Sequence, residues 1–82
     1  MWYEEDNQLV RHFSFRDFKE AFRFMTKVAE LAEELDHHPW WSNVYSDLTI
    51  KLSTHSAGNR VTDKDRDMAE KIDLILEQFR DQ

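Results

Sequence analysis

The sequence predicts one α+β domain, a two-layer sandwich in which a four-stranded antiparallel sheet carries helices on one face, in the order β-β-α-β-β-α. Short segments with alternating apolar and polar residues predict strands, and two longer segments with apolar residues every three or four positions predict amphipathic helices. The length of 82 residues fits a single domain, residues 1–82. Since each element would be apolar on one side only, the two helices are expected to share one face of the sheet.

The first two strands are predicted to form a hairpin. Residues 9–15 read Leu-Val-Arg-His-Phe-Ser-Phe, and this alternation with a period of two is typical of a strand. Trp2 and Tyr3 precede the segment 5–7, Glu-Asp-Asn, which has the composition of a turn. A short strand is therefore expected before that turn.

The strongest helix signal in the sequence begins at Asp17, a good N-cap, with Glu20 three residues later in the manner of a capping box. The helix is expected to end near the pair His37-His38, because Pro39 disfavours helical angles in the residue before it. The apolar stripe predicted to be buried comprises Phe18, Ala21, Phe22, Met25, Val28, Ala29, Ala32 and Leu35.

The second half of the chain is predicted to repeat the pattern of two strands and a helix. Residues 43–54 are β-rich, with a tight turn expected around 45–48 and a longer strand after it. A loop at 56–60 then precedes a helix that starts at Thr62, a favourable N-cap. Its predicted buried stripe is Met68, Ala69, Ile72, Ile75, Leu76 and Phe79.

Composition excludes several classes of function. Lys and Arg number 11 against 17 Asp and Glu, a net charge of −6, which disfavours direct binding to nucleic acid or to an anionic membrane. The absence of cysteine removes thiolate chemistry, and the single glycine, Gly58, disfavours phosphate-binding loops. No apolar run is long enough to cross a membrane, and the acidic N-terminus is unlike a targeting segment, so a cytoplasmic protein is expected.

Three histidines are the candidate reactive groups. His37, His38 and His55 lie at the ends of predicted elements, and imidazole can transfer protons near neutral pH. A His-His pair before proline is also simply a polar helix end. Zinc bound by these histidines with Asp36 or Asp65 is a further alternative, but the spacing typical of zinc sites is absent, so no metal site is predicted.

The positions of these residues resemble the motif of the pterin-4a-carbinolamine dehydratase family. Glu33 is followed after three residues by the triplet 37–39, His-His-Pro, then after five residues by Tyr45, after nine by His55 and after nine more by Asp65. The similarity extends from about Trp2 to Ile75.

The resemblance implies a hydro-lyase that removes water from 4a-hydroxytetrahydrobiopterin to give the quinonoid dihydropterin, with no metal and no organic cofactor. That reaction recycles the pterin cofactor of aromatic amino acid hydroxylases. His38 and His55 are expected to be the acid-base pair, with His37 positioning the pterin or sharing the proton transfer. The residues expected to bind the substrate or to orient the reactive groups are Glu33, Pro39, Trp41, Tyr45 and Asp65. Of these, Glu33 is expected to orient the His37-His38 pair, and Asp65 to hold an imidazole or a pterin nitrogen.

Simpler roles remain open for several of these residues. Glu33 could be a solvated helix charge, and Asp65 could only complement the helix dipole. The aromatic side chains of Trp40, Trp41 and Tyr45 could stack on the pterin or belong to the core.

The resemblance also implies a homo-oligomer, a dimer or a tetramer. Without disulfides, a chain of 82 residues gains stability from association. Aromatic residues near the chain ends, Trp2, Tyr3 and Phe79, are expected to supply apolar surface for it.

Two other functions are kept as alternatives: a protein-binding dimerisation cofactor or transcriptional coactivator, and an enzyme of another pterin pathway such as that of molybdopterin.

Overall fold

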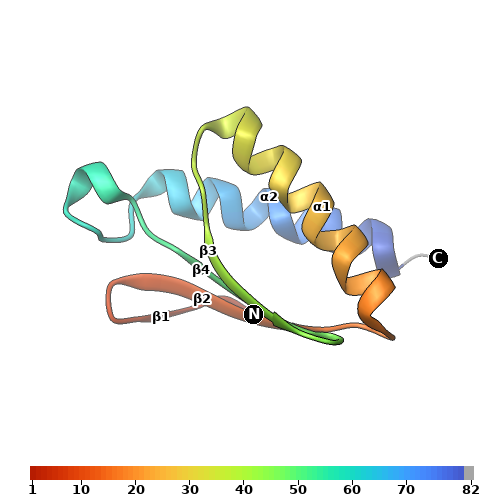
Figure 1. Ribbon diagram of the computed structural model, residues 1–82. Coiled ribbons are helices and arrows are strands. Elements are labelled where there is room, and N and C mark those ends of the chain that lie inside the picture. Colours follow the sequence, from red (N-terminus) through yellow and green to blue (C-terminus); the bar gives the residue numbers. More distant parts are fainter. Residues whose placement is uncertain (81–82) are drawn as a thin grey trace.

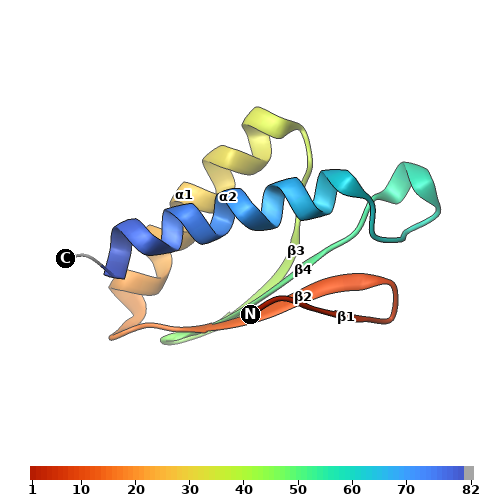
Figure 2. The same ribbon diagram turned by 180° about the vertical axis from the view of Figure 1, so that it is seen from behind.

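The computed structural model describes residues 1–80, and its elements follow the predicted order (Figure 1). Strands β1 (Tyr3–Glu5), β2 (Gln8–Ser14), β3 (Trp40–Val44) and β4 (Asp47–Leu52) form one antiparallel sheet in the spatial order β1-β2-β4-β3. The helices are α1 (Phe18–Leu35), the short 3₁₀ helix η1 (His55–Ala57) and α2 (Asp63–Arg80). Both long helices lie on the same side of the sheet, as Figures 1 and 2 show. The predicted α+β fold is confirmed.

Two-residue turns connect the strands of each hairpin. In the first turn Asp6 and Asn7 have φ of 52° and 63°, the left-handed conformation of a type I′ turn that suits the twist of a hairpin. The second turn contains Tyr45, with φ of 53°. β3 begins earlier than the β-rich segment 43–54 suggested, since the extended chain pairs with β4 from Trp40 onward.

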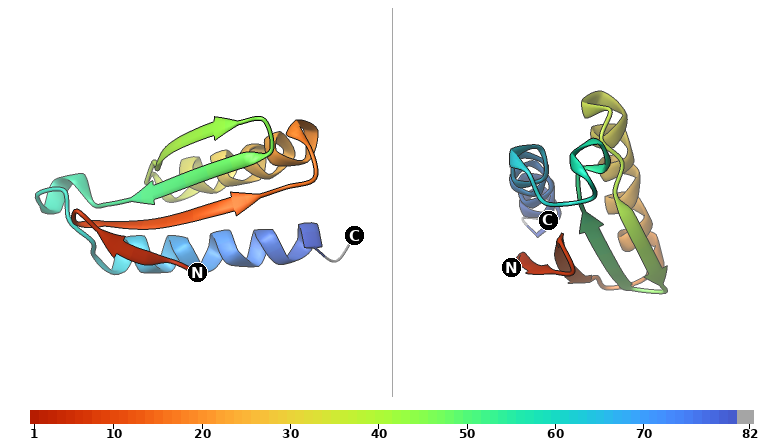
Figure 3. Two further views of the ribbon diagram at one scale, coloured as in Figure 1. Left: turned by 90° about the horizontal axis from the view of Figure 1, so that it is seen from below. Right: turned by 90° about the vertical axis from the view of Figure 1, so that its left-hand side faces the viewer.

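The core lies between the sheet and the two helices. Figure 3 shows α1 beside the β3–β4 half of the sheet and α2 beside the β1–β2 half. The buried side chains of the core include Phe13 from β2, Phe24 and Val28 from α1, Leu48, Ile50 and Leu52 from β4, and Met68 and Ile72 from α2. The buried stripe predicted for α2 is confirmed, with Ile75 and Phe79 at its margin.

The face of α1 that packs on the sheet differs from the predicted stripe. Phe18, Phe22 and Ala29 are exposed, and Phe24 and Leu31 are buried in their place. Apolar residues cover two adjacent faces of this helix, and their spacing alone does not say which face meets the sheet. The second face therefore leaves Phe22 with 55% of its surface exposed.

The prediction that Trp2 and Phe79 supply exposed apolar surface near the chain ends is also wrong. Trp2 and Phe79 pack against the core, and only Tyr3 of that group is exposed. The indole Nε1 of Trp2 donates a hydrogen bond of 2.8 Å to Asp73 on α2. This bond, together with apolar packing, holds the start of the chain against α2.

Candidate active site

The three candidate histidines line one pocket. It lies where the segment after α1, the end of β4 with η1, and the start of α2 come together, and its volume is about 410 Å³. That volume is within the range of small-molecule sites. The residues that line it are all of polar types, and their carbon atoms also contribute to its surface: Asp36, His37, His38, Ser53, Thr54, His55, Ser56 and Lys64. Such a pocket suits a polar ligand rich in hydrogen-bonding groups.

The end of α1 directs the His37-His38 pair away from the helix. Asp36 adopts a left-handed conformation (φ 50°, ψ 45°), and its N–H donates to the carbonyl of Glu33 at 3.3 Å. The N–H of His37 donates to the carbonyl of Ala32 at 3.0 Å, which completes a Schellman motif. Because the histidines lie beyond the helix, they are free of the 100° separation of adjacent helical side chains.

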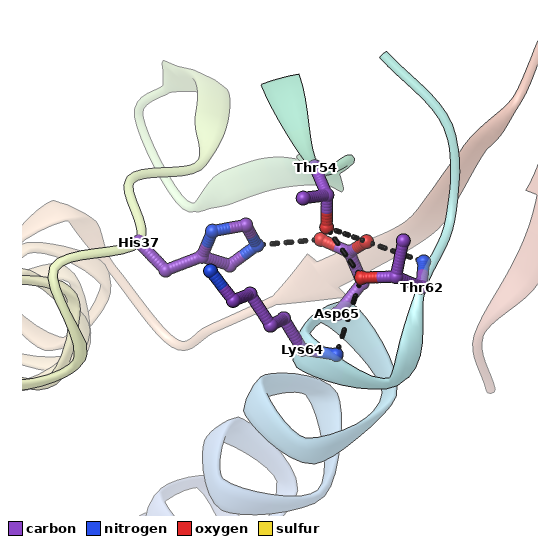
Figure 4. Close-up of polar contacts among 5 residues, drawn as sticks. All are labelled: His37, Thr54, Thr62, Lys64 and Asp65. Atoms are coloured by element: carbon purple, nitrogen blue, oxygen red, sulfur yellow. Dashed lines mark hydrogen bonds and ion pairs between the residues drawn. The ribbon is translucent and has the colours of Figure 1, made fainter. Parts of the chain in front are cut away.

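A buried carboxylate holds the first histidine. Asp65 is 0% exposed, and its Oδ1 lies 2.6 Å from Nε2 of His37 (Figure 4). Its Oδ2 accepts hydrogen bonds of 2.8 Å from the hydroxyl of Thr54 and from the backbone N–H of Thr62. A buried carboxylate is costly unless it is hydrogen-bonded, and these three contacts reduce that cost.

The local sequence explains where this carboxylate lies. Thr62 precedes α2, and its Oγ1 accepts a hydrogen bond from the N–H of Lys64 at 3.3 Å. Asp65 reaches back to the N–H of Thr62, which is the reciprocal arrangement of a capping box. The Thr-x-x-Asp pattern at the start of α2 therefore fixes Asp65 beneath the pocket.

The second histidine is paired with a carboxylate at the surface. Nε2 of His38 lies 2.5 Å from Oε2 of Glu33, and the side chain of Glu33 is 79% exposed. Pairs in such solvated positions contribute little to stability. Of the two histidines that Glu33 was expected to orient, it contacts His38.

The third histidine is held by a residue that the sequence did not single out. Nδ1 of His55 lies 2.9 Å from Oδ1 of Asn59. Gly58 ends η1 with φ of 83° and Asn59 follows with φ of 58°, so the loop folds back onto His55. Asparagine adopts this left-handed conformation more readily than most residues, so the pair Gly58-Asn59 was the sequence signal for a tight turn after His55.

The aromatic residues predicted to stack on the pterin do not line the histidine pocket. Trp41 lines a separate apolar pocket of about 180 Å³ between β3 and α1, and Tyr45 is exposed at the β3–β4 turn. Trp40 faces the opposite side of the sheet, with Nζ of Lys51 4.8 Å from its ring centroid. Pro39 adjoins His38, and the five residues of β3 that follow it extend over roughly 17 Å, so Tyr45 at the far end of the strand lies well away from the histidine pair. Stacking of these aromatic rings on a ligand stays a prediction.

Sequence reasoning missed the two threonines of the site. Thr54 is buried and Thr62 is half-buried, and their hydroxyl oxygens lie 2.6 Å apart. The position of Thr54 immediately before His55 and the capping pattern at Thr62 were the available signals.

Within residues 1–80, no group of three histidine or acidic side chains is arranged to hold a metal ion. No helix in that part of the chain combines the length and the apolar character needed to cross a membrane.

Comparison with known proteins gives consistent matches over most of the chain. The family model described as pterin 4 alpha carbinolamine dehydratase matches residues 1–75. A relative from Prochlorococcus marinus strain MIT 9313 is 51% identical over 74 residues, which cover 90% of this chain and 76% of the relative. A relative from Bradyrhizobium is 53% identical over 76 residues, with the same coverages of 90% and 76%. Both are named, provisionally, as pterin-4-alpha-carbinolamine dehydratases.

Two solved structures share the fold. The crystal structure of a transcriptional coactivator/pterin dehydratase from Brucella melitensis has a TM-score of 0.85 and 45% identity, covering 90% of this chain and 80% of the other. A pterin dehydratase-like protein identified as a RuBisCO assembly factor in the alpha-carboxysome has a TM-score of 0.74 and covers 92% and 86% of the two chains. Its identity of 20% supports likeness in fold alone.

Proposed function

Since the chain belongs to the pterin 4 alpha carbinolamine dehydratase family, we propose that it eliminates water from 4a-hydroxytetrahydrobiopterin to give the quinonoid dihydropterin. The observation that carries this proposal is the meeting of His37, His38 and His55 at one polar pocket. In this role the protein recycles the pterin cofactor of aromatic amino acid hydroxylases.

The reaction needs two proton transfers and no change of oxidation state. The bond between C4a and the hydroxyl oxygen breaks, and that oxygen takes a proton from an acid and leaves as water. N5 loses its proton to a base, and its electrons form the new double bond to C4a. An imidazolium and a neutral imidazole can serve as this acid and this base near neutral pH.

The hydrogen bonds of the pocket support a division of roles among the histidines. His38 and His55 are exposed, and each has one ring nitrogen held, by Glu33 and by Asn59 respectively. Their other nitrogens are suited to exchange protons with a ligand, so we assign them as the acid-base pair. His37 is held by the buried Asp65, which suits a residue that positions the pterin or shares the proton transfer.

The test is a direct assay with synthetic 4a-hydroxytetrahydrobiopterin, following the absorbance of the quinonoid product against the spontaneous reaction. The His12→Ala variant is a matched control, since His12 lies on the open face of the sheet, bound to Tyr3 and Thr49 at 2.9 and 2.8 Å. Wild type and His12→Ala should accelerate the dehydration equally. A wild-type rate equal to the spontaneous rate would refute the proposal. Parallel assays with other 4a-hydroxytetrahydropterins would test whether another pterin pathway is served.

We also propose that copies of the chain associate as a dimer or a tetramer. Phe18 and Phe22 are exposed on α1 with their rings stacked at 5.7 Å, beside the apolar pocket lined by Met25, Ala29 and Trp41. Among the described residues, β3 pairs only with β4, so its outer edge is open. The same apolar face supports the alternative of a protein-binding or coactivator role.

A further inference from the structure

We propose that Thr54 and Thr62 are positioning residues for His37, since they hold the carboxylate of Asp65 in the orientation in which it accepts from Nε2 of that ring. The consequence for turnover rests on the proposed function, whereas the consequence for the imidazole ring does not. The proposal follows from counting the hydrogens in the contacts beneath the pocket (Figure 4).

The hydrogen bonds around Thr54 and Thr62 can run in only one direction. The carboxylate oxygen Oδ2 of Asp65 accepts, so the single hydroxyl hydrogen of Thr54 is used on it, at 2.8 Å. The contact of 2.6 Å between the two hydroxyls must then use the hydrogen of Thr62. The backbone N–H of Lys64 points to Thr62 Oγ1 at 3.3 Å and can only donate, which agrees with that direction.

The carboxylate that this chain holds determines the state of His37. Oδ2 of Asp65 receives two donors, the hydroxyl of Thr54 and the N–H of Thr62, so the carboxylate is held in one orientation. Its other oxygen, Oδ1, lies 2.6 Å from Nε2 of His37 and can only accept. Nε2 must therefore carry a hydrogen, and in the neutral ring Nδ1 is the nitrogen with the free lone pair.

Burial makes the arrangement specific to His37. Asp65 is fully buried and Thr54 is 5% exposed, so water cannot replace a missing hydroxyl without rearrangement. The pair of His38 with Glu33 is solvated, and within residues 1–80 no hydroxyl group hydrogen-bonds to the carboxylate of Glu33. Loss of the Thr54 hydroxyl should thus affect the ring of His37 and leave that of His38 unchanged.

The experiment measures ¹⁵N chemical shifts of the imidazole nitrogens in labelled protein, together with dehydratase kinetics. The variants are Thr54→Val, which has a similar shape and no hydroxyl, and Thr54→Ser, which restores the hydroxyl. Thr49→Val is the matched control, because it removes a hydroxyl bound to His12 on the open face of the sheet.

In wild type, Thr54→Ser and Thr49→Val, we expect neutral His37 to carry its proton on Nε2. In Thr54→Val we expect the same tautomer, since Asp65 can still only accept, but changed ¹⁵N shifts of the His37 ring because its contact with Asp65 is held less firmly. We also expect a fall in kcat of about tenfold with KM within about twofold, in line with weakened proton transfer. Unchanged ¹⁵N shifts of the His37 ring in folded Thr54→Val would overturn the proposal, even if that variant were less stable. Should Thr54→Val fail to fold, Thr62→Val removes the donor to the Thr54 hydroxyl at a half-buried position. Its effect on the His37 ring should be smaller, since the backbone N–H of residue 62 still binds Asp65. Absent turnover in wild type with the expected ¹⁵N shifts would refute the proposed function and leave this inference standing.

Discussion

Replacing Asp65 by asparagine should invert the hydrogen bonding of His37 while preserving the shape of the site. The asparagine carbonyl oxygen can still accept from the Thr54 hydroxyl and from the N–H of Thr62, the two donors now on Oδ2. Its amide group then faces Nε2 of His37, which must accept rather than donate. The ring is thereby forced to carry its proton on Nδ1.

The size of the effect on stability follows from the contacts that change. Two hydrogen bonds to a charged oxygen become neutral ones, at a cost of roughly 1 kcal/mol each. The smaller desolvation cost of a neutral amide offsets part of that loss, so the free energy of unfolding should fall by about 1–2 kcal/mol. For a domain of this size the expected decrease in Tm is about 5–10 °C.

The effect on catalysis should be larger. A proton held on the wrong nitrogen of a proton-transfer site lowers kcat by about 10²-fold or more. Thermal unfolding followed by circular dichroism and the dehydratase assay measure the two effects. Glu33→Gln is the matched stability control: it makes the same chemical change in a solvated pair, and its stability should change by less than about 1 kcal/mol. Asp65→Asn with unchanged Tm and unchanged kcat would refute the reasoning.

Two further predictions concern the reaction itself. His38→Ala and His55→Ala should each lower kcat by about 10²-fold or more with little change in Tm, because both side chains are exposed in the pocket. Near-normal turnover in both variants would contradict their assignment as the acid-base pair. Activity should also survive dialysis against a strong chelator, since the imidazoles supply the proton transfers. A loss that added Zn²⁺ alone restores would favour a metal mechanism instead.

The order of the elements could be predicted from sequence because each element is apolar on one side only and is bounded by a strong signal. Asp17 caps α1 through a hydrogen bond of 2.9 Å to the N–H of Glu20, as the sequence indicates. The buried face of α1 could not be predicted, because Phe22 and Phe24 are equally apolar and only the packing partners decide between them. Phe24 packs against the aromatic rings of Phe13 in β2 and of Phe15 directly after that strand, and these contacts place Phe24 in the interior.

Some features of the site also follow from nearby residues, whereas others depend on contacts between segments that are distant in the sequence. The end of α1 at the histidine pair follows from nearby residues, chiefly Pro39. The burial of Asp65 does not, since a carboxylate in the first turn of a helix is ordinarily solvated and stabilised by the helix dipole. In the folded chain this carboxylate accepts a hydrogen bond from Thr54, which follows β4 and lies 11 residues away in the sequence. Tyr45 was suggested as a site residue by the family motif and not by its neighbours, and within one chain β3 separates it from the histidine pair.

The last prediction is that the protein associates through the exposed face of α1. Phe22 leaves 55% of its surface exposed, which for a phenylalanine corresponds to about 100 Å². At roughly 25 cal/mol per Å², burying it contributes about 2.5 kcal/mol, and a twofold interface contains it twice. The loss of about 5 kcal/mol in Phe22→Ser should weaken association by about 10³-fold or more.

Analytical ultracentrifugation at micromolar concentration tests this prediction. Wild type should sediment as a dimer or a tetramer, and Phe22→Ser should sediment as a smaller species. Leu74→Ser is the control, because Leu74 is 59% exposed on α2, away from the α1 face. Dissociation by Leu74→Ser with no effect of Phe22→Ser would place the interface on α2 instead. If wild type is a monomer at this concentration and is fully active, the pocket of one chain is sufficient and the proposed association is wrong.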